Sequence, residues 1–248
     1  MKLFILYILI GMLGQLIDGS MGMAYGVTCS TFLRAFTGLP AATASASIHF
    51  AEIFTTCSSA ISHIKLHNVD KKMFYKLLLP GVIGGVTGAV LLSRMNLEVW
   101  EIIIDVYLII IGISILSKVR TKKKKVNKFK KIPILGFVGG ASDAIGGGGW
   151  GPIVTSTLIA SDHDVRTTIG TVNSVEFFIT VTESIVFFFL QGNAFMRFSV
   201  PIVGLIIGGV IVSPFAAFLC TKLPKKIIII MTGLLIILIN SWSLICDF

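Results

Sequence analysis

The sequence predicts an all-α integral membrane protein built from two homologous halves, and three observations carry this prediction. Apolar residues make up 54% of the 248 residues and charged residues only 13%, against about 25% charged residues in a soluble domain. Apolar runs of about 20 residues, long enough to cross a bilayer, fill most of the chain. A glycine-rich segment that begins with aspartate interrupts two of these runs, 125 positions apart.

We expect about eight hydrophobic helical units, four in each half, separated by polar turns. The first run, Leu3 to Ile17, has one preceding lysine and no clear Ala-x-Ala cleavage site, so we expect it to be mature structure and not a signal peptide. The halves span residues 1–117 and 132–248, and residues 118–131 join them. The predicted units are Leu3–Phe36, Ala41–Ile64, Phe74–Leu92, Val99–Ser117, Ile132–Ala160, Thr167–Leu190, Phe198–Thr221 and Ile227–Ile245.

The clearest part of the repeat lies in the first unit of each half. The segment DGSMGMAYG at 18–26 recurs as DAIGGGGWG at 143–151. A glycine-rich break in an apolar helix frees backbone N–H and C=O groups, which a membrane tolerates only where protein or a watery cavity receives them. Matching breaks in two halves are typical of a transporter binding site.

The second helix of each half repeats at a shift of 124 residues and carries a polar stripe on one face. The matched pairs are Ser45/Ile169, His49/Asn173, Glu52/Glu176 and Thr56/Thr180. The third units share a proline followed by two glycines four residues apart, which let helices approach closely in a bilayer. These residues are Pro80, Gly84 and Gly88 in the first half, and Pro201, Gly204 and Gly208 in the second.

The charges between the units predict how the halves are oriented. The loop after the second unit is basic in the first half only, and the loop after the third unit is basic in the second half only. This exchange favours inverted halves. Inversion requires an odd number of crossings per half, which follows if each broken unit is a re-entrant hairpin. Eight plain spans are the alternative, and both arrangements fit the charges.

Residues 118–131 form a basic run that holds nine of the 21 Lys and Arg residues and accounts for the net charge of +9. Beside a membrane segment, such a run indicates a cytoplasmic loop in contact with anionic lipid, and not a nucleic-acid site. The four cysteines, Cys29, Cys57, Cys220 and Cys246, stand in apolar contexts without paired spacing. We expect them to be buried filler, with no disulfide or metal site.

The glycine breaks are the predicted substrate site. Two half-helix N-termini near the bilayer midplane would present free N–H groups and partial positive charge to an anion, and glycine lets backbone approach it. The alternative is that the glycines only relieve crowding and that the two aromatic residues anchor packing. The candidate substrate-binding residues are Ser20, Gly22, Tyr25, Gly26, Ser47, Gly147, Gly148, Gly149, Trp150, Gly151, Arg166, Thr171 and Asn173.

Acidic residues inside membrane units are the candidates for coupling, because charge there is costly and usually functional. Asp18 and Asp143 either cap a half-helix or carry protons. Glu52 and Glu176 either couple transport to protons or support the broken segments by hydrogen bonding. His49 either relays protons or joins helices. Asp105 and Glu183 also fall within membrane units.

Two arginines and two histidines have competing interpretations. Arg34 and Arg166 end the first unit of each half, where they either clamp an oxyanion or reach toward lipid headgroups. His63 and His67 are four residues apart, as some metal pairs are. We expect both to be in a solvated basic loop and to bind no metal.

The same segments resemble those of the TauE/SafE family, the sulfite-exporter-like membrane permeases. The resemblance rests on Gly19 to Gly26, on Gly146 to Pro152, and on the run Arg166-x-x-x-Gly170-Thr171 that opens the following helix. It covers nearly the whole chain and implies transport of sulfur-containing anions such as sulfite, sulfoacetate and other organosulfonates. The two halves differ at the matched pairs Ser45/Ile169 and His49/Asn173, so their two half-sites would be unequal.

The sequence therefore predicts a secondary transporter of small oxyanions in the plasma membrane that works by alternating access, with coupling to protons through Glu52 or Glu176 as an open interpretation. The resemblance implies a permease or exporter of sulfur-containing oxyanions such as sulfite or organosulfonates. A channel with the glycine breaks as its filter is the alternative, although such filters usually need several chains around one axis. A membrane-embedded enzyme is disfavoured because no nucleophile–base set is recognisable. We expect no cofactor, and the sequence does not specify an oligomeric state.

Overall fold

The computed structural model describes most of the chain. The described residues are 2–38, 40–95, 102–103, 105–106, 108–110, 112–113, 116–117, 131–161, 163–192, 199–220, 222 and 224–246. The predicted unit Val99–Ser117 is therefore described only in part, and the basic run lies outside the described residues except for Lys131.

The described residues are helical and include no strand, which confirms the predicted all-α class for that part of the chain. Helix ends lie within three residues of the predicted unit ends. The helices are α1 Lys2–Met21, α2 Tyr25–Thr37, α3 Ala41–Lys65, α4 Lys71–Arg94, α6 Ile132–Gly146, α7 Trp150–Ala160, α8 Val165–Gln191, α9 Ser199–Leu219 and α10 Lys225–Cys246.

Two helices begin earlier than their apolar runs because aspartates cap them. The carboxylate of Asp70 accepts hydrogen bonds from the backbone N–H groups of Lys72 (2.8 Å) and Met73 (3.1 Å) at the start of α4. Asp164 accepts from the N–H of Thr167 (2.9 Å) in α8. Such caps satisfy N–H groups that have no partner within the helix.

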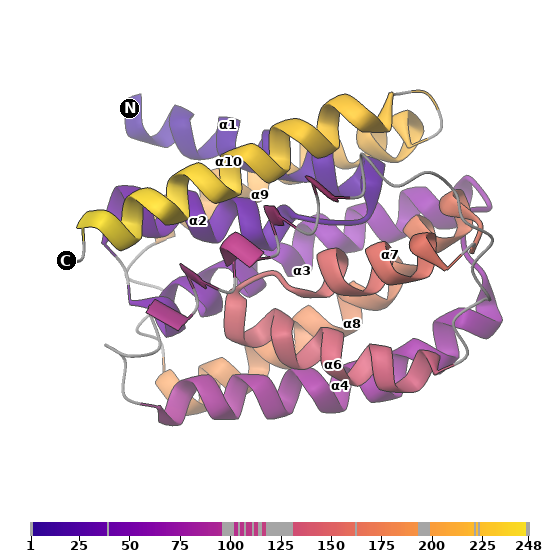
Figure 1. Ribbon diagram of the computed structural model, residues 1–248, viewed down its shortest axis with the longest axis horizontal. Helices are drawn as coiled ribbons and strands as arrows, with labels where there is room; N and C mark the ends of the chain where they lie inside the picture. Colours follow the sequence, from indigo (N-terminus) through magenta and orange to yellow (C-terminus); the bar gives the residue numbers. More distant parts are fainter. Residues whose placement is uncertain are drawn as a thin grey trace.

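Helices from different parts of the chain pack in pairs (Figure 1). α4 lies along α6 and α1 lies along α9, while α3 packs against α8 with α4 and α9 beside them. A Cβ atom added at Gly84 or Gly88 would meet the backbone of α6. One added at Gly204 or Gly208 would meet α1. The predicted close-packing role of these four glycines is confirmed.

Both broken units fold back on themselves after the break. A Cβ atom on Gly14 of α1 would lie 3.0 Å from the Sγ atom of Cys29, which is one turn into α2. In the other unit, a Cβ atom on Gly139 of α6 would meet the side chain of Val154 in α7. In each pair, the glycine lies two helical turns before the break and its partner lies one turn after it, so the chain reverses direction at the break. Figure 1 shows α1 and α2 running in opposite directions, as do α6 and α7.

The outside of the molecule is apolar and much of its interior is polar. Large apolar side chains are exposed along most helices, among them Leu79 (66%), Phe189 (79%) and Trp242 (66%). Contiguous exposed apolar surface on this scale is typical of a membrane protein. Among the described residues, the helices long and apolar enough to cross a membrane are α1 from Leu3, α4, α8 and α9.

Candidate substrate and coupling site

The two glycine breaks lie directly against each other. A Cβ atom on Gly26 would overlap the backbone of Gly147 and Gly148. One on Gly151 would lie 2.7 Å from the carbonyl oxygen of Gly22 and 2.5 Å from the Cα of Met23. A shift of 125 residues converts the first set of contacts into the second. The repeat therefore brings its own two copies into contact, and glycine is required at both crossing points.

The backbone within the breaks also depends on glycine. Gly22 has φ +66° and Gly147 has φ +65°, and the next residue, Gly148, has φ +148°. These conformations are in the half of φ space that other residues rarely adopt. Ala24 is an exception, with φ +89° and without glycine's freedom. The glycines thus end α1 and α6 where the sequence predicts the breaks.

Side chains from the neighbouring segments bond carbonyl groups at the breaks. The hydroxyl of Thr155 in α7 donates to the carbonyl of Gly22 (2.5 Å). The hydroxyl of Ser45 in α3 donates to the carbonyl of Ala144 (2.7 Å). These bonds supply partners to backbone groups that a broken helix leaves free.

The aspartates that precede the breaks differ in their contacts. Asp143 Oδ1 accepts a hydrogen bond from the N–H of Trp150 (2.9 Å), so the carboxylate caps α7 as one interpretation predicted. The Asp143 carbonyl accepts from the N–H of Gly148 (3.1 Å). Asp18 is equally buried, but neither of its carboxyl oxygens has a hydrogen-bond partner.

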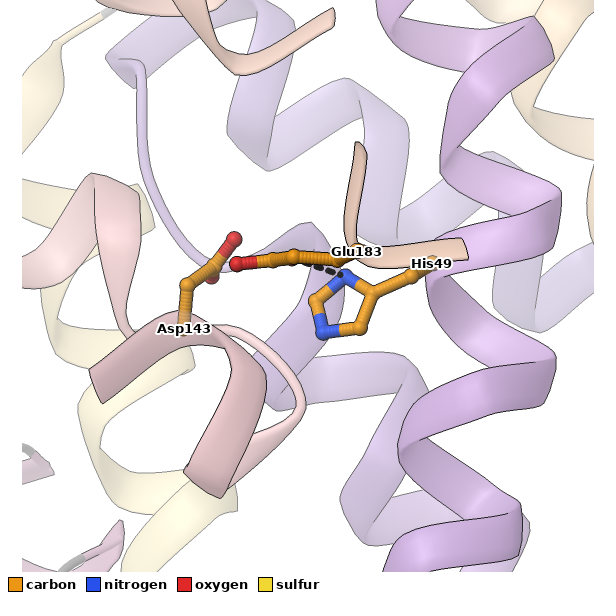
Figure 2. A group of neighbouring side chains, drawn as sticks. All are labelled: His49, Asp143 and Glu183. Carbon is orange, nitrogen blue, oxygen red and sulfur yellow. Dashed lines mark ion pairs between the residues drawn. The ribbon is translucent and has the colours of Figure 1, made fainter. Parts of the chain in front are cut away.

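A cluster of titratable side chains lies beside the second break. His49 Nδ1 lies 2.9 Å from Glu52 Oε2 and 3.2 Å from Glu183 Oε2. One polar side-chain atom each of His49, Asp143 and Glu183 lies within 4.8 Å of the others. Figure 2 shows the carboxyl groups of Asp143 and Glu183 directed toward each other, with the imidazole of His49 beside Glu183. These residues come from α3, α6 and α8.

Asp18 and Glu176 extend this cluster. Asp18 interacts electrostatically with Glu52 and Asp143, and Glu176 interacts with those carboxyls and with Glu183. Five buried carboxyl groups thus interact with one another, and three of them, Glu52, Asp143 and Glu183, lie beside the buried imidazole of His49. Uncompensated charge is very costly inside a membrane protein. The cluster is therefore stable only when protons or cations balance most of that charge. We call it the carboxyl cluster; its members are Asp18, His49, Glu52, Asp143, Glu176 and Glu183.

Glu52 connects the carboxyl cluster to the first break. A Cβ atom on Gly26 would lie 2.9 Å from Glu52 Oε1. The structure therefore brings the predicted coupling residues and the predicted substrate-binding glycines into one region.

The two aromatic residues of the breaks are fully buried and bonded to other helices. Tyr25 donates its hydroxyl proton to the carbonyl of Leu205 in α9 (3.3 Å). Trp150 donates its indole N–H to the carbonyl of Val172 in α8 (3.1 Å). These contacts fit the interpretation in which the aromatic residues anchor the packing of the hairpins.

Other predicted binding residues have partners away from the breaks. Ser20 and Ser47 bond carbonyls of their own helices, and Asn173 accepts from Ser59 in α3 (2.6 Å). Thr171 accepts from the N–H of Asp70 (2.8 Å). Arg166 is exposed and donates to the side chain of Asn68 and the carbonyl of Leu66. Thr171 and Arg166 thus contact the segment between α3 and α4, and not the breaks.

The expectation that His63 lies in a solvated loop is wrong. α3 continues to Lys65, and His63 in its last turn is fully buried against α1. Its Nε2 lies 3.1 Å from the carbonyl oxygen of Gly19 and its Nδ1 lies 3.1 Å from Asn68 Nδ2. His67 is exposed and follows the helix, as expected.

Two acidic residues acquire partners that the sequence pattern does not specify. Asp105 forms an ion pair with Arg34 (2.8 Å), which accounts for the arginine at the end of α2. Glu183 belongs to the carboxyl cluster. Its position within a membrane unit was the available signal, but its neighbours come from two other helices and have no fixed spacing in the sequence.

Comparison with known proteins gives two matches. The family profile described as "Sulfite exporter TauE/SafE" matches residues 7–242. The chain is also 40% identical over 257 residues to the "Probable membrane transporter protein YtnM" of Bacillus subtilis (strain 168), covering 99% of this chain and 84% of that protein. No solved structure matches the chain.

Proposed function

This chain belongs to the TauE/SafE family of membrane transporters, and on this premise we propose that it carries small sulfur-containing oxyanions by alternating access around the paired breaks. Sulfite and organosulfonates are the proposed substrates. The transporter assignment follows from the family, and the family's name, sulfite exporter, suggests sulfite.

The observation that carries the proposal is the contact between the two breaks. α2 begins at Tyr25 and α7 begins at Trp150, so two helix N-termini start at the same place. Helix N-termini present N–H groups and partial positive charge, which suit an anion. We assign the backbone amides near Gly22–Gly26 and Gly147–Gly151 as the groups that hold the substrate during transport.

Contacts between distant segments support the inverted arrangement of the halves, residues 1–117 and 132–248. Arg166 bonds Asn68, and Gln191 donates to the carbonyl of Ala42 (3.1 Å). Between Asn68 and Arg166 the chain passes through α4, the predicted unit Val99–Ser117 and the broken unit α6–α7, and between Ala42 and Gln191 it also passes through α3 and α8. Both members are on one side of a membrane if α6–α7 returns to the side it entered. A crossing broken unit would place them on opposite sides.

Contacts of the first broken unit, α1–α2, also support a return to the side from which the chain entered. Gly204 near the start of α9 contacts Tyr7 near the start of α1, and Gly19 near the end of α1 contacts Ala216 in α9. α1 and α9 are therefore parallel. The end of α2 leads into α3, whose Ala42 bonds Gln191 just before α9. Both ends of the first unit are thus on the side where α9 begins, as a re-entrant hairpin requires.

The carboxyl cluster supports coupling to protons. An anion beside several ionised carboxylates would be repelled, so its entry requires protons that neutralise them. The candidate proton carriers from the sequence, Asp18, His49, Glu52, Asp143 and Glu176, are all in this cluster. We further place the protein in the plasma membrane, with residues 118–131 cytoplasmic and near anionic lipid.

Uptake of radiolabelled sulfite into proteoliposomes tests this function. We expect saturable uptake that an imposed pH gradient drives and that unlabelled organosulfonates inhibit more strongly than acetate. Counterflow should accelerate uptake, as it does for a carrier. Conductance without saturation or counterflow would replace the carrier by the channel. Absence of flux in correctly inserted protein would exclude sulfite as the substrate.

A further inference from the structure

Glu183 occupies a confined position between three helices. A Cβ atom on Gly85 of α4 would lie 2.5 Å from Glu183 Oε1, so backbone of α4 is on one side of the carboxyl group. His49 of α3 is 3.2 Å away on another side. The carboxyl group of Asp143 in α6 faces it (Figure 2). Gly85 leaves just enough room for the carboxyl group, which therefore has little freedom to turn away from Asp143.

The facing carboxyl groups of Asp143 and Glu183 are buried with few hydrogen-bond donors around them. His49 Nδ1, which lies 3.2 Å from Glu183 Oε2, is closer to Glu52 Oε2 at 2.9 Å. Two carboxylates at this range repel each other, whereas one proton between them provides a hydrogen bond and removes a charge. The other titratable groups that face the pair are His49 and Glu52 from α3, Asp18 from α1 and Glu176 from α8.

We propose that Glu183 is a proton-coupling residue, which shares the transported proton with Asp143 and thereby controls the second break. This inference rests on the proposed transport function. The sequence places Glu183 within a membrane unit but assigns it no specific role.

Asp143 connects this proton to the substrate site. Its Oδ1 caps α7 through the N–H of Trp150, and its carbonyl accepts from the N–H of Gly148. When the proton leaves the pair for water on the open side, Asp143 and Glu183 repel each other. That repulsion acts on the residue that fixes the start of α7, so loss of the proton loosens the break. Proton uptake restores the cap.

The test uses Glu183→Gln in the full-length protein, because glutamine keeps the size and polarity of the side chain but does not exchange a proton. One coupled proton supports about tenfold accumulation of substrate for each unit of pH gradient, because 1.4 kcal/mol corresponds to a factor of ten. We expect wild type to accumulate radiolabelled sulfite accordingly. In Glu183→Gln the accumulation ratio should fall to about one, while sulfite counterflow at equal pH remains above that of protein-free liposomes.

Asp70→Asn is the matched control, since it makes the same acid-to-amide change at an exposed helix cap. It should accumulate sulfite as wild type does. If Glu183→Gln does not insert, Asp143→Asn is the second variant, because asparagine can still cap α7. Gradient-driven accumulation in either inserted variant, or wild-type uptake driven by a sodium gradient instead, would overturn the proposal.

Infrared spectroscopy separates this inference from the proposed function. A protonated buried carboxyl group has its own C=O band, and Glu183→Gln should remove one such pH-dependent band from the wild-type spectrum. That result would support the shared proton even if wild type does not carry sulfite. An unchanged set of bands would refute it even if sulfite transport is demonstrated.

Discussion

The first and second breaks have the same plan in sequence but are held by different chemistry. In the second, Asp143 caps α7 and faces Glu183, and glycines occupy the whole turn. In the first, Asp18 caps nothing, and Met23 and Ala24 stand where the other copy has glycines. Thr155 instead bonds the carbonyl of Gly22. The second break is thus capped by a titratable carboxylate at the start of α7, whereas the carbonyls of Gly19 and Gly22 in the first break bond the side chains of His63 and Thr155.

The partners on α3 and α8 differ in the same way. His49 pairs with two glutamates, whereas its counterpart Asn173 bonds an uncharged serine. Duplication therefore preserves the geometry of the crossing, where glycines must fit, while the contacts of the matched titratable residues differ. If the protein works as proposed, we expect both copies to contact the substrate and the coupled proton to be held beside the second break.

The largest effect should come from exchanging matched residues of the breaks. Gly148→Met introduces the residue of the first copy at φ +148° and against the backbone of Gly26 and Val27. We expect transport to fall about 100-fold, because small displacements of a site have effects of that order. Met23→Gly, the reciprocal change, should retain most of the activity. Sulfite flux per inserted protein measures both, and equal losses would show that the two breaks are not distinguished as described.

A smaller effect should separate the two aspartates. Asp143→Ala removes a helix cap, which typically costs about 1 kcal/mol, and leaves the buried N–H of Trp150 without its partner. Asp18→Ala removes a carboxyl group that accepts no hydrogen bond, so it should not lower stability comparably. Thermal unfolding in detergent measures the difference, and each truncation removes the same atoms. A larger loss in Asp18→Ala would contradict the comparison.

The smallest effect concerns Ala24, which adopts φ +89° in the first break only. The left-handed conformation costs a non-glycine residue about 1–2 kcal/mol. Substitution by glycine removes this cost, but the greater flexibility of glycine in the unfolded chain offsets part of the stabilisation. Ala24→Gly should therefore raise the melting temperature slightly without reducing sulfite flux. A lower melting temperature would show that the alanine methyl group contributes packing that outweighs the strain.

The sequence predicts the parts of this structure that depend on local pattern. Apolar runs locate the helices, and the glycine-rich segments that recur at 18–26 and 143–151 locate the breaks, because clustered glycines weaken a helix. Asp143 caps α7, which is one of the two roles that the sequence allows for it, the other being to carry protons. This role is predictable because an aspartate before a helix start can reach the free backbone N–H groups of that helix. The substrate-binding and coupling assignments of the named residues stay predictions.

What the sequence could not provide are contacts between distant helices. His63 is three residues before a basic loop, and its burial depends on the carbonyl of Gly19 in another helix. Glu183 faces Asp143 because α8 and α6 meet there, which no spacing encodes. Thr171 and Arg166 resemble site residues by their place in a motif, yet their partners are on the segment after α3.

The pairing of α1 with α9 and of α4 with α6 has a mechanical consequence. Each pair joins a helix of one half to a helix of the other, through glycines that bring the backbones together. Moving the two halves as separate rigid bodies would displace both interfaces at once. At these interfaces the helix backbones are in close contact at glycines, with few side chains between them. If the protein works by alternating access as proposed, we expect each of the moving bodies to combine helices from both halves.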